Sequence, residues 1–534
     1  HLSVFQVTSN FNGCFRFVVI NMIKLLPLIF AVITGINAQQ NYNAAVLEYS
    51  PQIRNPTHTD AEYVATNVRR YIEFIGQAVS RQANIVVFPE YGLTTTNLPE
   101  NLFNVSTTVP DPVALVSPCV NRTEFVSFFL DLSCAANEHN IFVVVNLIER
   151  ANNIQNETIY YNTNVVFSSN GTVIARYRKI NLFNEPQLTA GNEVVTFVGF
   201  NNITFGLFTC FDILFRTPAQ DVLALGATDI IYLTAWTSET PFHHSFSIQD
   251  GYAKANGVNL LVSGYSNVTN GMAGAAIFSA DGAIISSSVT PAAAQNIFSA
   301  TLNVIMRRTP EAVCNNSTIG APRIGVLPEI TAVLLVMHEN MDLYTFEDLP
   351  LNVNTTSGQI CSEGTDFCCD YHIEFQTSLT TNSTIYKMAA FFGRRGFQGA
   401  ITSINTIGVR TCALLHCSST DNLSCGLFNA TTNVNFRSIR ITARLPSTNS
   451  SYQPATLDTN HTPLTSFNFC TTPDEASEEV QLDLHVNNPQ NVFSFGIFGR
   501  VHTLDGLPEG RGAASTVHVA LFAIITCICL VLLY

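Results

Sequence analysis

Short apolar runs alternate with amphipathic stretches over the first half of the chain, which is the pattern of an α/β protein. Residues 84–88 and 258–263 are apolar on both faces, as the strands of a buried parallel sheet are. Between strand candidates at residues 42–49 and 84–88, apolar side chains recur at helical spacing after Asp60, which would cap that helix. Strand, helix and strand in this order predict parallel pairing.

The pattern continues to about residue 300. Turn signals at Ser169-Asn170-Gly171 and Asp281-Gly282 predict two hairpins, the second of which closes this half of the chain as it would an α/β sandwich. Further helices are expected over residues 123–136, 218–225 and 241–256, and further strands over residues 141–148, 164–168, 172–177, 203–208, 228–233, 275–279 and 283–287.

Beyond about Arg308 the pattern changes. Residues 314–370 are rich in loops and carry four cysteines, and only short strands are expected after them. We therefore expect an α/β sandwich domain over residues 39–308 and a smaller, disulfide-stapled, mainly β domain over residues 309–505. The strands expected in the second domain span residues 371–377, 409–415, 436–444, 480–486 and 492–498.

Composition indicates a folded protein with more than one domain. Among 534 residues, 47% are hydrophobic and only 12% are charged, which is typical of globular domains with a large core. Acidic residues outnumber basic ones by 39 to 25, and no stretch forms a basic stripe. Nucleic-acid binding is therefore not expected.

Both ends of the chain carry patterns of processing signals. Met22 and Lys24 lie at the start of an apolar run that ends in small residues, which predicts a signal peptide over residues 22–38. Residues 1–21 add nothing to this signal and are expected to be upstream sequence translated in error. An apolar tail without basic residues after it favours a GPI-attachment signal over residues 510–534, and the alternative is a C-terminal anchor helix.

Cysteine and asparagine patterns fit this secretory route. Without the two ends, eleven cysteines remain, so at least one thiol is expected to be unpaired. Cys119 and Cys134 flank the helix expected at residues 123–136 and could join its ends. Candidate glycosylation sequons lie at Asn104, Asn121, Asn156, Asn170, Asn202, Asn267, Asn316, Asn354, Asn382, Asn422, Asn429, Asn449 and Asn460.

Cys210 stands directly after a predicted strand. Thr217 to Gln220 resemble a capping box with Pro218 at the first helical position, and Gly226 would end that helix. A strand, a turn with a cysteine and a helix would place the thiol where backbone N–H groups and the helix dipole favour a thiolate. The alternative is a buried or disulfide-bonded structural cysteine.

Glu90 and Lys179 occupy similar positions, each just past a predicted strand. Together with Cys210 they provide the groups that amide cleavage requires. Glu90 can act as general base, Cys210 as nucleophile, and Lys179 with the backbone N–H of Phe211 can stabilise an oxyanion. Taken alone, Glu90 could be a surface carboxylate and Lys179 a solvated lysine.

These residues lie in stretches that resemble the nitrilase superfamily, and within it the vanin and biotinidase branch, with the look of an insect-type member. The resemblance implies an α-β-β-α sandwich, a C-terminal β domain, a Glu90-Lys179-Cys210 triad and no cofactor. It also implies hydrolysis of pantetheine to pantothenate and cysteamine. Cleavage of biotin amides and an inactive scaffold are the alternatives. The matching stretches are residues 88–90, 177–183, 185–186, 205–215, 234–236 and 257–261, with Pro118-Cys119 and Ser133-Cys134.

The chain departs from this branch around the expected pocket. Tyr91 follows the glutamate where mammalian vanins resemble Phe-Pro-Glu-Asp-Gly, and residues 264–272 lack the expected histidines. Residues 242–245 differ as well, and we interpret His243 and His244 as surface histidines rather than metal ligands. The expected partners are a small amide substrate and, through a lipid anchor, the outer membrane surface of the cell, with a secreted form as an alternative.

Overall fold

A computed structural model describes residues 40–52, 57–280, 284–289, 295–306, 308, 329–330, 336–375, 385–397, 401–402, 404–427, 434–464, 466–474 and 478–512. The chain divides into residues 1–41 and residues 42–534, and the two domains described below lie in the second unit, apart from Asn41 at the start of the first strand. The predicted signal peptide, residues 513–534 of the predicted attachment signal, and Asn316, Asn382 and Asn429 lie outside the described residues.

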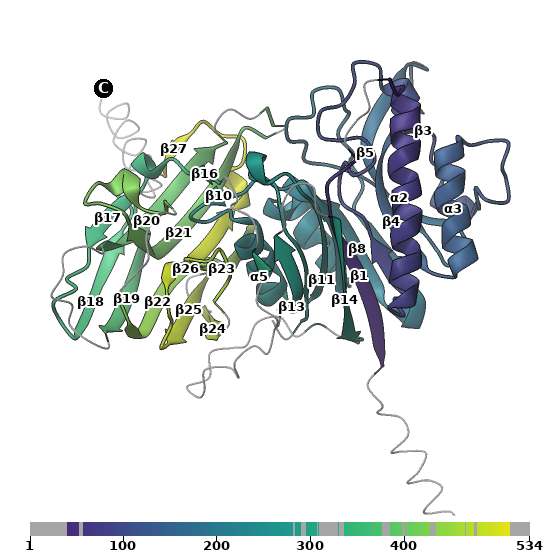
Figure 1. Ribbon diagram of the computed structural model, residues 1–534. Helices are drawn as coiled ribbons and strands as arrows, with labels where there is room; N and C mark the ends of the chain where they lie inside the picture. Colours follow the sequence, from purple (N-terminus) through teal and green to yellow (C-terminus); the bar gives the residue numbers. More distant parts are fainter. Residues whose placement is uncertain are drawn as a thin grey trace, which may run out of the picture. The chain divides into compact units, whose positions relative to one another are not determined.

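The first domain is built on two runs of strands that face each other across an apolar core (Figure 1). They meet where β1 pairs in parallel with β11 at Glu48 and Tyr49. One run holds β1 (Asn41–Tyr49), β2 (Ile85–Val87), β4 (Phe142–Asn152), β5 (Thr158–Phe167) and β6 (Val173–Arg178); the other holds β7 (Val195–Val198), β8 (Thr204–Thr209), β9 (Asp229–Thr234), β11 (Asn259–Tyr265), β12 (Ala275–Phe278) and β13 (Ile284–Val289).

Strand β1 shows why these runs are apolar on both faces. Successive side chains of a strand point to opposite sides of the sheet. Ala44 and Val46 enter the core between the two runs, whereas Ala45 and Leu47 enter a second core beneath the helices. The sandwich therefore has the predicted α-β-β-α layers, and β1 and β2 pair in parallel as expected.

Helices α2 (Asp60–Ser80) and α3 (Ser127–His139) lie side by side and cover the outer face of the first run (Figure 1). The cap of α2 is Thr59 and not Asp60, because the Thr59 side chain accepts from the Glu62 N–H while the Glu62 carboxylate accepts from the Thr59 N–H. On the second run, Tyr252 of α5 (Ser245–Asn256) packs edge-on against Phe208 of β8.

The second domain is a β-sandwich with its own apolar core, and every strand predicted in it is present. One sheet also contains β20, a strand that the sequence pattern does not predict and that delivers Arg395 toward the first domain. The sheets are β17 (Thr345–Asp348), β20 (Ile385–Gly396), β21 (Thr406–Cys417), β26 (Val492–Val501) and β23 (Ser450–Asp458), and β18 (Thr355–Cys361), β19 (Cys368–Phe375), β22 (Phe436–Pro446), β25 (Glu479–Asn487) and β24 (Phe467–Asp474).

Disulfides are present in both domains, and the sequence left their pairing open apart from one candidate pair. Cys119 is bonded to Cys134 of α3, which is that candidate pair, and Cys210 is the free cysteine among those described. Cys470 is also disulfide-bonded. The other pairs are Cys361–Cys368, Cys369–Cys412 and Cys417–Cys425, all within the second domain.

The bond between Cys369 of β19 and Cys412 of β21 joins the two sheets of the second domain. Replacing both cysteines with alanine is expected to lower the free energy of unfolding by about 4 kcal/mol, because the bond closes a long loop in the unfolded chain. The Cys361–Cys368 bond closes a loop of only 7 residues, and its loss should cost about 2 kcal/mol. Urea unfolding of the two double variants measures both losses, and the reverse order would contradict the loop-length argument.

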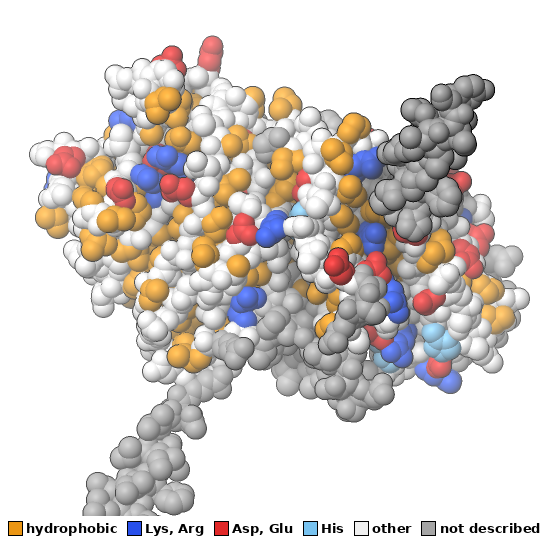
Figure 2. All heavy atoms as spheres, turned by 180° about the vertical axis from the view of Figure 1, so that it is seen from behind, with side chains coloured by type: hydrophobic (Ala, Val, Ile, Leu, Met, Phe, Trp, Pro, Cys, Tyr) orange, Lys and Arg blue, Asp and Glu red, His pale blue; other side chains and the backbone are white. Residues whose placement is uncertain are grey.

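The surface bears the predicted sequons. Nine of the ten described sequon asparagines are exposed, and Asn267 is partly buried. Lys and Arg side chains lie interspersed with Asp and Glu on the face drawn in Figure 2. Among the described residues, no helix is long and apolar enough to cross a membrane.

Candidate active site

The structure brings the three predicted site residues together. Glu90 follows β2, Lys179 follows β6 and Cys210 follows β8, and all three are buried, at 1%, 2% and 7% exposure. Lys179 Nζ lies 2.8 Å from Glu90 Oε1. All three side chains line one cleft, and the charges of Glu90 and Lys179 both act on the Cys210 thiol.

A second carboxylate, Glu185, completes the charge cluster. Its Oε2 lies 2.8 Å from Lys179 Nζ, so the ammonium bridges two buried carboxylates. Tyr91 donates its hydroxyl to Glu185 Oε1, and Asn162 Nδ2 donates to the same atom at 2.6 Å. Glu185 lies in a stretch that matches the family, but the sequence pattern gives it no role at the site. The sequence does not identify Asn162 as a site residue, because a strand sequence does not show which of its polar side chains faces a charged group.

Glu90 is held by donors on both of its oxygens. Oε1 accepts from Lys179 Nζ at 2.8 Å and from Asn162 Nδ2 at 2.8 Å, and Oε2 accepts from the Ala235 backbone N–H at 2.8 Å. Ala235 directly follows β9, so the second run of strands fixes a carboxylate that the first run supplies. The arrangement fixes the orientation of the Glu90 carboxylate.

The strand, turn and helix predicted around Cys210 are present, but the capping differs from the prediction. Helical turns cover residues 218–224: a π-helical turn, Arg216–Gln220, continues into α4, Asp221–Ala224, and Gly226 follows with φ +90°. Thr217 is extended, as residues before proline tend to be. The capping box instead involves Thr209 and Asp212, at the start of a 3-10 helix, Cys210–Leu214.

Cys210 itself has a φ of 49°, in the left-handed region that non-glycine residues rarely adopt. Such a conformation costs about 1 to 3 kcal/mol and persists where the surroundings enforce it. Here Tyr232 donates its hydroxyl to the Cys210 carbonyl at 2.9 Å, and Asp212 Oδ2 accepts from the Thr209 N–H at 3.0 Å. Phe211 is the second residue of the 3-10 helix, so its N–H has no acceptor within that helix.

The predicted thiolate at Cys210 is wrong for the resting site. Burial raises the pKa of the Cys210 thiol well above its usual range, and the neighbouring Glu90 charge raises it further, against the opposing effect of Lys179. The one-turn α4 adds little dipole to offset burial, because it supplies few aligned peptide groups. The thiol is therefore neutral at physiological pH and needs a base to react.

Cys210 lies between two hollows of different chemistry. The polar cleft contains Glu90, Lys179, Glu185 and Gln187. The second hollow has mainly aromatic and apolar walls, which are Phe183, Phe211, Ala235, Trp236, Met337 and Phe397 together with Cys210, Thr237, Glu239 and His243. We call this second hollow the aromatic pocket. Met337 and Phe397 follow the first domain in the chain, so both domains form its walls.

Comparison with known proteins agrees with this architecture. The carbon-nitrogen hydrolase family matches residues 43–305, and the vanin C-terminal domain matches residues 334–505. Vanin-like protein 3 of Drosophila melanogaster is 31% identical over 74% of this chain and 75% of its own length. The chain belongs to the vanin-like branch of the carbon-nitrogen hydrolases. A pantetheinase from Bos taurus is 28% identical (76% of this chain, 80% of that protein), and a biotinidase from Takifugu rubripes is 27% identical (75% and 83%).

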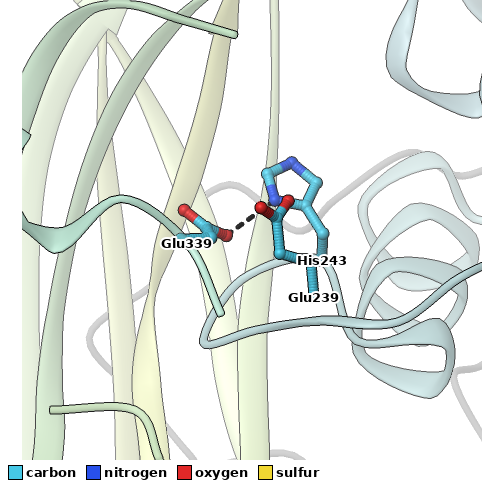
Figure 3. A group of neighbouring side chains, drawn as sticks. All are labelled: Glu239, His243 and Glu339. Atoms are coloured by element: carbon cyan, nitrogen blue, oxygen red, sulfur yellow. Dashed lines mark hydrogen bonds and ion pairs between the residues drawn. The ribbon is translucent and has the colours of Figure 1, made fainter. Parts of the chain in front are cut away.

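His243 and His244, where this vanin-like sequence departs from the family pattern, are both buried and not surface histidines. They precede α5, which begins at Ser245 and not at residue 241. His243 Nδ1 lies 2.7 Å from Glu339 Oε1 (Figure 3) and 2.8 Å from Arg395 Nη1. The sequence favours exposure here because it does not show that the second domain covers this segment.

Glu239, His243 and Glu339 place ligand-type atoms within 4.8 Å of one another. Arg395 already supplies the positive charge at this cluster, with Nη2 2.5 Å from Glu239 Oε2 and Nη1 2.9 Å from Glu339 Oε2. The guanidinium of the second domain thus neutralises two buried carboxylates at the junction with the first domain.

Glu339 should make this junction sensitive to acid. Burial alone would raise its pKa, but Arg395 and His243 outweigh burial and lower the pKa from 4.5 to about 2. A lowered carboxyl pKa adds stability that is present above pH 4.5 and is lost as the pH falls toward 2, by roughly 3 kcal/mol. Glu339→Gln is expected to remove this part of the pH dependence. Urea unfolding midpoints between pH 5 and pH 2.5 measure this pH dependence, and Glu73→Gln, at an exposed residue, is the control. If the midpoints of Glu339→Gln and wild type change with pH in parallel, the prediction is wrong.

Proposed function

We propose that this protein hydrolyses a linear amide through a thioester on Cys210, with pantetheine as substrate and pantothenate and cysteamine as products. The observation that carries the proposal is the free Cys210 thiol beside a buried Glu90–Lys179 ion pair, whereas every other cysteine in the described part of the chain is disulfide-bonded. A neutral thiol next to a carboxylate suits general-base activation.

In the proposed reaction, Glu90 takes the thiol proton as Cys210 Sγ attacks the carbonyl carbon. The oxyanion meets the backbone N–H of Phe211 and Lys179 Nζ. Within the described part of the chain, Glu90 and Glu185 take two of the three ammonium donors, so one remains for the oxyanion. When the C–N bond breaks, the amine leaves with the proton from Glu90.

Water then replaces the amine. Glu90 takes a proton from the water while the water oxygen attacks the thioester carbonyl. The C–S bond then breaks. The carboxylic acid leaves, and the proton held by Glu90 returns to the Cys210 sulfur. In this scheme Glu185 is a positioning residue, because it holds Lys179 beside Glu90 without touching the reacting atoms.

Turnover by the full-length protein, expressed in animal cells, tests the proposal. We expect a higher kcat/KM on pantetheine than on biocytin, a biotin amide of lysine. The relatives named pantetheinase and biotinidase are about equally similar to this chain, at 28% and 27% identity, so the assay decides the acyl group. If biocytin is hydrolysed faster, the proposed substrate is wrong and the proposed mechanism stands. If no linear amide is hydrolysed, the protein is an inactive scaffold.

We also propose a cell-surface location, with a signal peptide at residues 22–38 and a GPI anchor added near residue 510. Four described disulfides suit an oxidising compartment, and the exposed sequon asparagines suit glycosylation. Phosphatidylinositol-specific phospholipase C is expected to release the protein from expressing cells. Retention after treatment, with residues 517–534 still detected by antibody, would instead indicate a C-terminal anchor helix.

A further inference from the structure

The two hollows that meet at Cys210 have separate tasks in the proposed reaction. The departing amine must receive a proton from Glu90, and the incoming water must lose one to it. Both therefore need the polar cleft, which contains Glu90 and Lys179. The aromatic pocket contains Cys210 and neither of those two groups. It is the side on which the acyl group can remain bound to sulfur while the amine leaves and water enters.

The walls of the aromatic pocket suit an acyl chain that is apolar near its carbonyl. Phe211 packs edge-on against Phe397 of the second domain and is in ring contact with Phe183. The Trp236 indole N–H is already taken by the His243 carbonyl at 2.8 Å, so its ring acts as an apolar surface. Transfer of a chain of methylene groups onto such walls is favourable by area alone.

His243 provides the exception among these walls. Its Nδ1 is held by Glu339 and Arg395, and in Figure 3 the other ring nitrogen points away from the two carboxylates. Within the described part of the chain that nitrogen, Nε2, is buried and has no hydrogen-bond partner. A buried polar atom without a partner is costly and rare in native structures, and at a binding site a ligand can satisfy it.

We propose that the aromatic pocket binds the acyl group and that His243 Nε2 hydrogen-bonds a polar group carried on it. This inference rests on the proposed function and narrows it to linear amides with a chain that is apolar next to the carbonyl and bears a hydroxyl farther along, because the Nδ1 contact with Glu339 leaves Nε2 as an acceptor. Glu339 and Arg395 fix the ring from the second domain, so that domain takes part in substrate selection. His243 is then a specificity-determining residue.

Matched substrates test the inference. The substrates are amides of one small amine, made in pairs over a short series of acyl chain lengths. One member of each pair has a hydroxyl at the far end of the acyl chain, and the other has a methyl group there. Released amine is measured fluorimetrically with the full-length protein. At the best length we expect wild type to prefer the hydroxylated member by about tenfold in kcat/KM, the size of one buried hydrogen bond.

Two substitutions separate the nitrogens of the ring. His243→Asn can keep a polar atom near Glu339 but has none at the position of Nε2. We expect the ratio of kcat/KM between the hydroxylated and the methyl substrate to fall close to one in this variant. His243→Gln places its amide farther along and is expected to retain part of the preference. His416→Phe is the control, because His416 is also buried with an unpartnered ring nitrogen but does not line the pocket; its preference should equal that of wild type.

The outcomes distinguish this inference from the proposed function. Hydrolysis by wild type with no preference, or an equal preference in His243→Asn and wild type, overturns the role of His243 and leaves the amidase intact. A collapse of the preference in His416→Phe overturns it as well, because a general change in packing would then be sufficient to abolish the preference. Absence of hydrolysis on every pair, with Cys210 still alkylated by iodoacetamide, overturns both proposals.

Discussion

Replacing Cys210 with alanine is expected to lower amide turnover by on the order of 10^5- to 10^6-fold, to the limit of detection. The side chain forms the bond to the acyl group, and no other described cysteine has a free thiol that could take its place. The hydrogen bond from the Tyr232 hydroxyl to the carbonyl of residue 210 and the one from the neighbouring Thr209 N–H to Asp212 do not involve the thiol, so both survive the substitution. Steady-state turnover of pantetheine by the purified variant measures the loss.

The unfolding midpoint of Cys210→Ala serves as its control, and we expect it to stay close to that of wild type. Glu90→Gln offers a second control with the thiol intact. It removes the proposed general base, so turnover of pantetheine should be lost, whereas iodoacetamide should still alkylate Cys210 because the charge that opposes ionisation of the thiol is gone. A Cys210→Ala protein that turned over pantetheine at the wild-type rate would refute the thioester mechanism.

Much of the fold could be predicted because its signals are local. Strands β1, β2, β4 and β11 are continuous apolar runs, and a short run of this kind fits a sheet that is covered on both faces. The strands of the second domain that escaped prediction, such as β18 and β23, are rich in Ser and Thr and alternate weakly. Their register is set by neighbouring strands, which a single segment does not encode.

The site divides in the same way. Glu90, Lys179 and Cys210 each follow a strand, and the sequence shows strand ends. The predicted thiolate failed because the sequence does not show how deeply the thiol is buried, and burial dominates its pKa. Glu185 and His243 escaped prediction for a related reason. Their importance comes from contacts with residues elsewhere in the chain, Lys179 in one case and Arg395 in the other.

Replacing Lys179 with methionine is expected to remove activity and also to destabilise the first domain by about 3 to 5 kcal/mol. The substitution leaves Glu90 and Glu185 buried without their shared cation, and both carboxylates lie within hydrogen-bond distance of Asn162 Nδ2. Without the ammonium, the two carboxylates repel each other where water cannot screen them. Urea unfolding of the variant at neutral pH measures the loss of stability.

A double variant separates the two roles of Lys179. Lys179→Met with Glu185→Gln removes one of the two unpaired charges, so it should recover much of the stability measured by urea unfolding but none of the turnover of pantetheine. Lys387→Met is the matched control. Lys387 is also buried, but its ion-pair partner Asp348 is exposed and stays hydrated without it. The loss of stability should therefore be smaller, and turnover of pantetheine should persist. Recovery of turnover in the double variant would show that Lys179 acts only by neutralising Glu185, and the oxyanion would then need another donor.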